Sequence, residues 1–234
     1  MKKKVYISLI IINVFLIVVN IVLTINLFNP NNPTKIFNNN IESIVEIKAS
    51  SESVGESFGT GIIYSNDGYV ITNAHVISYK SHSEENVFDN IQIRFTKDED
   101  YKDVTFIKKD SNLDLAILKI NDINIKYKPI TISKDKYSYG DLVYAIGNTS
   151  NYGIGISQGI ISVPEVKVTY DDISRLVIQS DIDISSGNSG GALLDEKGNL
   201  IGITTFRSRD SKGNVNYGFV FSIPIRVINE FINK

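Results

Sequence analysis

The sequence predicts an all-β protein in which two six-stranded antiparallel β-barrels pack together, with a short C-terminal helix after them and an N-terminal transmembrane helix before them. Three observations predict this class. Short runs rich in Val, Ile, Tyr, Phe and Thr recur between Gly, Asn and Asp, a pattern typical of strands. The runs form two groups of about six, as expected for a pair of barrels. Residues 5–28 form one uncharged apolar stretch.

The N-terminal apolar stretch is long enough to cross a lipid bilayer, because 24 helical residues span about 36 Å. Lys2, Lys3 and Lys4 precede it, so we expect a single-pass cell-membrane protein with a cytoplasmic N-terminus and the remaining chain outside the cytoplasm. The alternative is a cleaved signal peptide. Its apolar core is usually shorter, and no small-x-small cleavage site follows Phe28, so we favour an uncleaved anchor.

Polar segments divide the rest of the chain. We expect a cytoplasmic tip and membrane anchor at 1–28, a linker at 29–40, an N-terminal barrel at 41–126, and a C-terminal barrel with the closing helix at 127–234. Asn and Pro predict the linker, and the polar stretch 121–128 predicts the connection between the barrels. Residues 78–90 are a polar insertion that we expect to be a surface loop.

The individual strands follow from the apolar runs. In the N-terminal barrel we expect strands at 44–48, 57–64, 69–72, 91–95, 104–108 and 113–120, with a hairpin turn at Asp67-Gly68. In the C-terminal barrel we expect strands at 130–133, 142–146, 154–163, 176–179, 200–206 and 217–223. Pro224, followed by apolar residues at helical spacing, predicts the closing helix.

Composition and charge exclude several classes of function. Three of the 24 Lys and Arg residues precede the apolar stretch, so the rest of the chain carries 21 against 26 acidic residues, and nothing indicates a nucleic-acid partner. The chain has no cysteine, which excludes disulfides, thiolate catalysis and cysteine-bound metal. Two histidines exclude a multi-histidine metal site. We therefore expect neither a metal nor a cofactor.

The stretch 185–191, Ser-Ser-Gly-Asn-Ser-Gly-Gly, joins two apolar runs and predicts a tight turn with an exposed serine hydroxyl. Gly187 permits a backbone conformation in which amide N–H groups point at one spot beside Ser189. This suits a nucleophile whose oxyanion hole is made by the Gly187 and Ser189 amides. Such turns are common in β proteins, so the interpretation depends on a base and an orienting acid elsewhere.

Only His75 and His82 could supply the base. His75 follows a predicted strand and has apolar neighbours able to hold its ring, whereas His82 lies in the polar insertion, where an exposed loop residue is expected. Asp114 stands within an apolar run, and burying an acid there is costly unless it is paired. Hydrogen bonding to an imidazole N–H would pair it. The alternatives are a histidine satisfied by backbone groups and an edge-strand acid facing water.

Five motifs occur in one order along the chain: Gly-Thr-Gly at 59–61, Thr-Asn-Ala-His-Val at 72–76, Asp-Leu-Ala-Ile-Leu-Lys at 114–119, Ala-Ile-Gly-Asn at 145–148 and Gly-Asn-Ser-Gly-Gly at 187–191. With these motifs the chain resembles the trypsin-like serine proteases, and among them the HtrA (high-temperature-requirement) family, over residues 41–232. The order His, Asp, Ser is that of the chymotrypsin type. The resemblance implies chymotrypsin-like barrels and a serine endopeptidase.

The resemblance also implies roles and partners. Ser189 would be the nucleophile, His75 the general base, and Asp114 the residue that orients His75, with the Gly187 and Ser189 amides as the oxyanion hole. Substrates would be proteins or peptides, unfolded ones included, and homo-oligomers are common in the family. A PDZ domain usually follows the protease domain in this family, whereas this chain ends at Lys234, so we expect no such domain. The alternative is a catalytically silent protease fold that serves as a binding or scaffolding module.

Substrate specificity is the open part of the resemblance. Asp183 lies six residues before Ser189, where an aspartate in trypsin-like enzymes floors the specificity pocket and selects Lys or Arg. Asp183→Ala would then lower cleavage after basic residues. Thr204 and Phe206 belong to the strand expected to line the same cleft, and the Phe206 ring could exclude a long basic side chain. The alternatives are a turn acid bonded to nearby amides for Asp183 and a core aromatic for Phe206.

Overall fold

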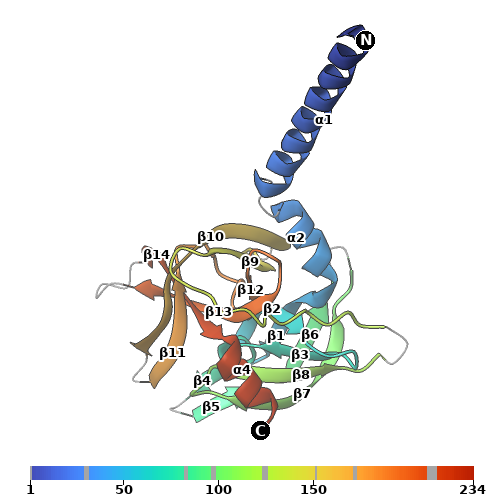
Figure 1. The fold of residues 1–234 in the computed structure, drawn as a ribbon. Coiled ribbons are helices and arrows are strands. Elements are labelled where there is room, and N and C mark those ends of the chain that lie inside the picture. The colour runs from blue at the N-terminus through green and yellow to red at the C-terminus, as the bar shows by residue number, and fades with distance from the viewer. Residues whose placement is uncertain are drawn as a thin grey trace. The chain divides into compact units, whose positions relative to one another are not determined.

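The structure, a computed structural model, describes residues 2–28, 32–81, 84–95, 99–122, 126–150, 152–170, 173–209 and 215–234. The chain forms two compact units, 1–32 and 33–234. The first contains helix α1 (Lys2–Phe28), and the second contains two β-barrels (Figure 1). His82 lies outside the described residues.

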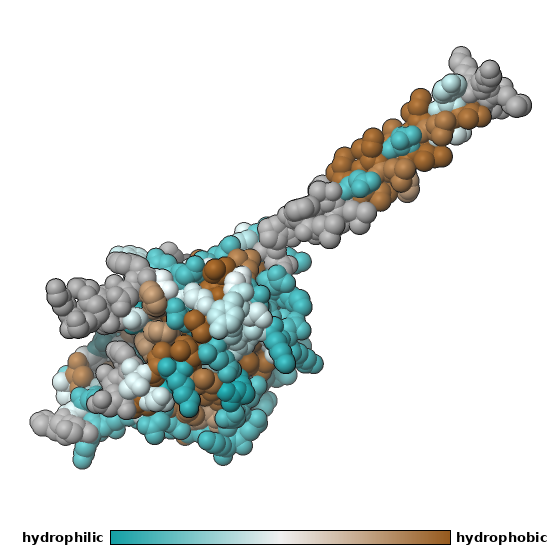
Figure 2. All heavy atoms as spheres, turned by 60° about the vertical axis from the view of Figure 1, so that its left-hand side comes forward, coloured by the Kyte–Doolittle hydropathy of each residue, from teal (hydrophilic) through white to brown (hydrophobic). Residues whose placement is uncertain are grey.

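Helix α1 presents apolar side chains between Val5 and Ile21, most of which are exposed (Figure 2). Asn13 and Asn20 interrupt this surface, and the side-chain amide of each donates to the carbonyl oxygen four residues earlier at 2.9 Å. Both acceptors belong to the same helix, so the helix itself provides a hydrogen-bond partner for each side-chain amide. Within the described part of the chain, no helix combines the length and the hydropathy needed to cross a membrane.

Six antiparallel strands close the N-terminal barrel in the order β1-β2-β3-β8-β7-β6. They are β1 (Ile44–Ser51), β2 (Gly55–Ile63), β3 (Tyr69–Thr72), β6 (Asn90–Arg94), β7 (Lys102–Asp110) and β8 (Leu115–Ile120). The short helix α3 (Ala74–Ile77) follows β3, and the hairpin of β4 (Ser78–Ser81) and β5 (Glu84–Val87) follows α3. Alternate residues of β1, Val45 and Ile47, fill the barrel interior, as the period of a strand requires.

The C-terminal barrel is closed in the order β10-β11-β14-β13-β12-β9. Its strands are β9 (Leu142–Asn148), β10 (Ile154–Tyr170), β11 (Ile173–Ser180), β12 (Ala192–Leu194), β13 (Leu200–Arg209) and β14 (Val215–Pro224). Helix α4 (Ile225–Ile232) begins after Pro224 and buries Ile228 and Phe231. The mostly β architecture with a short C-terminal helix agrees with the expected fold class.

One hydrophobic core lies between the barrels and fixes their relative position. Its members from the two barrels include Ile44, Ile62, Ile71, Leu115, Ile117, Tyr144, Ile146, Ala192, Leu194, Leu200, Ile203 and Ile223. These side chains are almost fully buried, and burying each of the Leu and Ile side chains contributes about 1.5–3 kcal/mol of favourable transfer free energy. Strands β3 and β8 of one barrel and strands β9 and β12 of the other all contribute to this core.

Three segments differ from the expected secondary structure. Residues 130–133 form no strand: Ile130 N–H bonds to the N-terminal barrel and Ser133 N–H to the C-terminal barrel, so the segment follows neither ladder, and β12 completes the second barrel. The insertion 78–90, expected to be a surface loop, contains strands β4 and β5, which pair with each other. Its polar residues do not show the apolar alternation from which strands were predicted. The range 29–40 contains helix α2 (Pro33–Asn40), which buries Ile36 in the shared core.

Candidate active site

The His75 ring is held at the start of the N-terminal barrel's α3. Its Nδ1 lies 2.9 Å from Asp114 Oδ2 and 3.0 Å from Oδ1, and its backbone N–H donates to Oδ1 at 3.0 Å. Asn73, fully buried at the end of β3, donates from its side-chain amide to the Asp114 carbonyl at 2.9 Å. With Nδ1 engaged, Nε2 is the nitrogen left for proton transfer, on a side chain that is 49% exposed.

Asp114 is buried in the turn before β8 and adopts a positive φ of 56°, rare for a residue with a side chain. Besides His75, Thr205 Oγ1 donates to Asp114 Oδ2 at 2.6 Å. Burial alone would raise the pKa of this carboxyl, but the His75 ring and the hydrogen bonds from His75 and Thr205 outweigh it, so its pKa lies below the ordinary value. Asp114 is therefore ionised at neutral pH.

The segment 185–191, called the Ser189 turn below, joins β11 to β12 through a tight backbone path. Asn188 N–H donates to the Ser185 carbonyl at 3.2 Å, and Gly187 has a φ of +93°, which together describe a type II turn. A Cβ at Gly187 would lie 2.5 Å from the carbonyl oxygen of Asn148, so only glycine fits. The glycines therefore serve the packing of the turn as well as its conformation.

The carbonyls of the Ser189 turn are held from outside it. Ser150 N–H donates to the Ser186 carbonyl at 2.8 Å, Thr60 Oγ1 to the Gly187 carbonyl at 2.8 Å, and Thr60 N–H to the Ser189 carbonyl at 2.9 Å. In a trans peptide the N–H points opposite to the C=O, so Gly187 N–H faces away from Ser150. Among the hydrogen bonds of the described residues, neither Gly187 N–H nor Ser189 N–H has an acceptor.

The three predicted catalytic residues, His75, Asp114 and Ser189, all line one cleft of about 420 Å³. Ser189 Oγ donates to the backbone carbonyl of Thr205 at 2.9 Å, and no hydrogen bond to His75 is found for this hydroxyl in the described structure. Thr205 thus contacts both Asp114 and Ser189. Proton transfer requires this hydroxyl to donate to His75 in place of Thr205.

Comparison with known proteins decides the family. The trypsin-like peptidase domain matches residues 59–203, more than half of the chain. The serine endoprotease DegS of Haemophilus influenzae is 35% identical over 179 residues, which are 76% of this chain and 50% of that protein. The HtrA-type protease AlgW, solved with a tripeptide, matches 86% of this chain and 62% of its own with a TM-score of 0.71 and 29% identity. The chain belongs to the HtrA family of trypsin-like serine proteases.

A periplasmic DegP-like serine endoprotease of Buchnera aphidicola is also similar, with 33% identity over 179 residues, 76% of this chain and 36% of that protein. This HtrA-family chain therefore spans half or less of the length of these curated relatives. The predicted family is confirmed, and so is the chymotrypsin-like fold of the barrels.

The residues expected to contact substrate occupy different places in the HtrA-family fold. Phe206 lines the cleft, and its ring stacks at a tilt on Phe221 with the centroids 5.1 Å apart. Thr204 is buried beneath the Ser189 turn, where its hydroxyl donates to the Asn188 carbonyl at 2.6 Å. Asp183 is exposed and lines a neighbouring cavity of about 240 Å³, which shares Ile184 and Ser185 with the cleft. Of the three, only Phe206 reaches the cleft that holds Ser189.

This placement predicts that Asp183 does not select basic residues. We expect Asp183→Ala to keep the wild-type order of cleavage preferences, because Arg175 and Arg207, rather than Asp183, line the cleft. Phe206→Ala should change that order, since it removes a ring from the cleft wall. Cleavage of a peptide library measures both. A selective loss of cleavage after Lys and Arg in Asp183→Ala would contradict the expectation.

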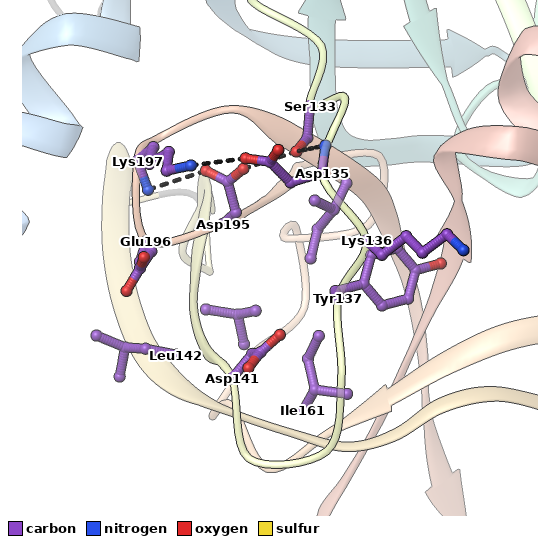
Figure 3. A pocket seen from close by; sticks show the side chains of 12 residues that line it. Ser133, Asp135, Lys136, Tyr137, Asp141, Leu142, Ile161, Asp195, Glu196 and Lys197 are labelled. Carbon is purple, nitrogen blue, oxygen red and sulfur yellow. Dashed lines mark hydrogen bonds and ion pairs between the residues drawn. The ribbon is translucent and has the colours of Figure 1, made fainter.

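Another concave region, of about 260 Å³, lies on the C-terminal barrel and contains none of the predicted catalytic residues (Figure 3). Two pairs of its polar groups contact each other: Lys197 Nζ lies 2.7 Å from Asp135 Oδ2, and Ser133 Oγ donates to Asp195 Oδ2 at 2.7 Å. The described lining includes no histidine, so Ser133 has no imidazole base there. The described lining of this pocket therefore offers no serine–histidine pair.

Sequence reasoning missed Thr205 and Thr60. Thr205 contacts both Asp114 and Ser189, and Thr60 holds two carbonyls of the Ser189 turn. Each threonine lies within a strand, where threonine is a common residue and carries no local signal of a functional contact. Only the Gly-Thr-Gly motif at 59–61 marked the neighbourhood of Thr60.

Proposed function

We propose that the chain is a serine endopeptidase that hydrolyses peptide bonds of proteins outside the cytoplasm through an acyl-enzyme on Ser189. The observations that support it most are the cleft shared by the His75–Asp114 pair and Ser189, and the Gly187 and Ser189 N–H groups, which have no acceptor among the described residues. A nucleophile, a base held in one orientation and an anion-binding site are the requirements of acyl transfer.

In the first half-reaction, Ser189 Oγ attacks the carbonyl carbon of the scissile peptide while its proton passes to His75 Nε2. The ionised Asp114 stabilises the imidazolium and holds the tautomer that has a free Nε2. The negative charge on the carbonyl oxygen is stabilised by Gly187 N–H and Ser189 N–H. His75 then gives the proton to the leaving amine, the C–N bond breaks, and an ester remains on Ser189.

In the second half-reaction, water attacks the ester carbonyl and gives a proton to His75 Nε2. The same two amides bind the second oxyanion. The C–Oγ bond breaks, His75 returns the proton to Ser189 Oγ, and the acid product leaves. Besides water, the two half-reactions use only the side chains of His75, Asp114 and Ser189 and the two amide N–H groups.

A fluorophosphonate probe tests the function, because it phosphonylates only a serine that is activated as a nucleophile. We expect wild-type chain to be labelled and Ser189→Ala to be unlabelled. Ser186→Ala is the matched control, since Ser186 lines the same cleft in the same turn and should leave labelling intact. Absence of wild-type labelling, or labelling that survives Ser189→Ala, would favour the binding-module alternative. Cleavage of a denatured test protein separates a protease from an esterase.

We also propose that residues 5–28 anchor the chain in the cell membrane with the barrels outside the cytoplasm. The support is the uncharged apolar sequence, the three lysines before it, and the exposed apolar side chains of α1. The anchor is inferred from the composition of residues 5–28 and from the lysines that precede them.

Alkaline extraction of membranes tests the anchor. We expect the wild-type chain to stay with the lipid, and the double variant Ile11→Arg/Phe15→Arg to be released, because each arginine opposes insertion by about 2.5–3.5 kcal/mol. Both positions are exposed on α1, at 63% and 66%, so the substitutions disturb no packing within the helix. The variant Ile11→Leu/Phe15→Leu is the control. Release of the wild-type chain by alkali would overturn the anchor.

A further inference from the structure

A carboxylate is buried where the proposed reaction does not use it. Glu46 on β1 is fully buried, and Arg94 of β6 donates to its Oε2 from Nη2 at 2.8 Å and from Nε at 3.2 Å. Its Oε1 has no hydrogen-bond partner among the described residues. Taking an ion pair out of water costs several kcal/mol per charge. Replacing a buried ion pair by well-packed apolar residues often leaves a fold equally stable. Stability alone therefore does not explain this pair.

The Glu46 carboxylate also contacts the second barrel. Asn148, fully buried at the end of β9, donates from Nδ2 to Glu46 Oε2 at 3.1 Å. The backbone N–H of the same Asn148 donates to Thr60 Oγ1 at 2.8 Å. Glu46 and Thr60 are themselves directly paired across β1 and β2. Glu46, Asn148 and Thr60 therefore form one connected group between the barrels.

This group ends on the Ser189 turn. Thr60 Oγ1, which accepts from Asn148, donates to the Gly187 carbonyl at 2.8 Å, and Thr60 N–H donates to the Ser189 carbonyl at 2.9 Å. These two carbonyls belong to the peptides that follow Gly187 and Ser189, so Thr60 fixes where these two residues lie. The peptide that carries Gly187 N–H is held instead by Ser150 N–H at the Ser186 carbonyl. If the peptide before Gly187 turned over to a type I turn, Gly187 N–H would point away from the cleft.

We propose that Glu46 is a positioning residue for the oxyanion site, because through Asn148 and Thr60 it holds the Gly187 and Ser189 carbonyls and so the position of the two residues whose N–H groups form that site. The inference rests on the proposed function. Without the carboxylate charge, Arg94 loses its ionic contact with Glu46 and the Asn148 amide loses a charged acceptor. Asn148 then holds Thr60 less firmly in the orientation that reaches Gly187.

The test compares Glu46→Gln with Glu56→Gln in the full chain. Glu56 is the matched control, because it pairs with Lys48 at 2.7 Å across the same two strands but is exposed. We expect Glu46→Gln to lower kcat about 10–100-fold with KM within about twofold, since losing an oxyanion donor outright costs about 10²–10³. The pH profile should be unchanged, because the variant leaves the His75–Asp114 pair intact.

Inhibitor binding separates positioning from general damage. A peptide aldehyde forms a tetrahedral adduct whose oxygen occupies the oxyanion site, whereas the matching peptide alcohol has no such oxygen. Glu46→Gln should weaken aldehyde binding about 10–100-fold, in step with kcat, and leave alcohol binding unchanged. Equal losses for both inhibitors, or a kcat equal to that of Glu56→Gln, would overturn the proposal.

A second pair of variants decides the matter if Glu46→Gln does not fold. Thr60→Val removes the hydroxyl at nearly constant volume, and Thr60→Ser retains it. We expect Thr60→Ser to keep most of kcat and Thr60→Val to lose about 10–100-fold. Full kcat in Thr60→Val would break the connection and overturn the inference. A wild-type chain that neither cleaves nor is labelled overturns the proposed function as well, whereas an active wild type with a normal Glu46→Gln overturns only this inference.

Discussion

Asp114→Asn should lower kcat by about 10⁴ at neutral pH with little change in KM. The Asp114 side chain accepts from the backbone N–H and Nδ1 of His75 and from Thr205 Oγ1. Asparagine has one acceptor oxygen for these donors, and its NH₂ group would face either the imidazole or the threonine. An NH₂ group against Nδ1 selects the tautomer with the proton on Nε2, which cannot take a proton from Ser189.

The measurement is kcat and KM on a peptide substrate across pH. Asp103→Asn is the matched control, because Asp103 belongs to the same barrel, is exposed and accepts one bond from Gln92 Nε2 at 2.8 Å. It should retain wild-type kcat. A kcat for Asp114→Asn within tenfold of wild type would contradict the assigned role.

The Asp114 carboxylate also affects stability against pH. Because its pKa is lowered in the folded state, its charge stabilises the fold above the ordinary aspartate pKa, and this contribution is lost as the pH falls through the lowered value.

Gly190→Ala is expected to abolish most activity and to destabilise the fold by about 2–5 kcal/mol. Gly190 has a φ of +83°, which costs a residue with a Cβ about 1–2 kcal/mol. A Cβ there would also overlap the carbonyl oxygen of Thr60 and Oγ1 of Thr72. Thr60 cannot yield freely, because it holds the Gly187 and Ser189 carbonyls. Relief of the overlap therefore moves the amides proposed to bind the oxyanion.

Gly140→Ala separates the two causes. Gly140 has nearly the same φ, +80°, but a Cβ there would meet nothing within 4 Å. We expect it to lose about 1–2 kcal/mol of stability and no activity. Denaturant unfolding and kcat, measured on both variants, show whether the overlap with Thr60 accounts for the larger losses expected in Gly190→Ala. Equal effects of the two substitutions would mean that the backbone conformation alone is responsible.

The candidate site was predictable where its residues stand in distinctive local patterns. Ser189 lies in a glycine-rich turn, His75 directly follows a strand, and Asp114 is an acid in an apolar run. Each pattern depends on neighbours along the chain, and the structure places all three side chains on one cleft. Thr205 had no such pattern, because a threonine in a strand looks the same whether or not it contacts an acid on another strand.

The positions of Asp183 and Glu46 could not be predicted for a related reason. Spacing from Ser189 suggested a specificity role for Asp183, but the direction of a side chain near a turn depends on the backbone path, and the structure places Asp183 in another cavity. Glu46 lies within the predicted strand 44–48, and nothing in that run singled it out. It is buried because the second barrel covers that face of β1, which no pattern within β1 reveals.

The sequence by itself determined the β class, most strand positions, the closing helix and the family, because alternation, turn residues and short motifs are properties of neighbouring residues. Only the tertiary structure decided that Thr205 joins Asp114 to Ser189, and that Glu46, Asn148 and Thr60 support the Ser189 turn. These contacts join residues up to 127 positions apart, and they exist only because an apolar core holds two barrels face to face.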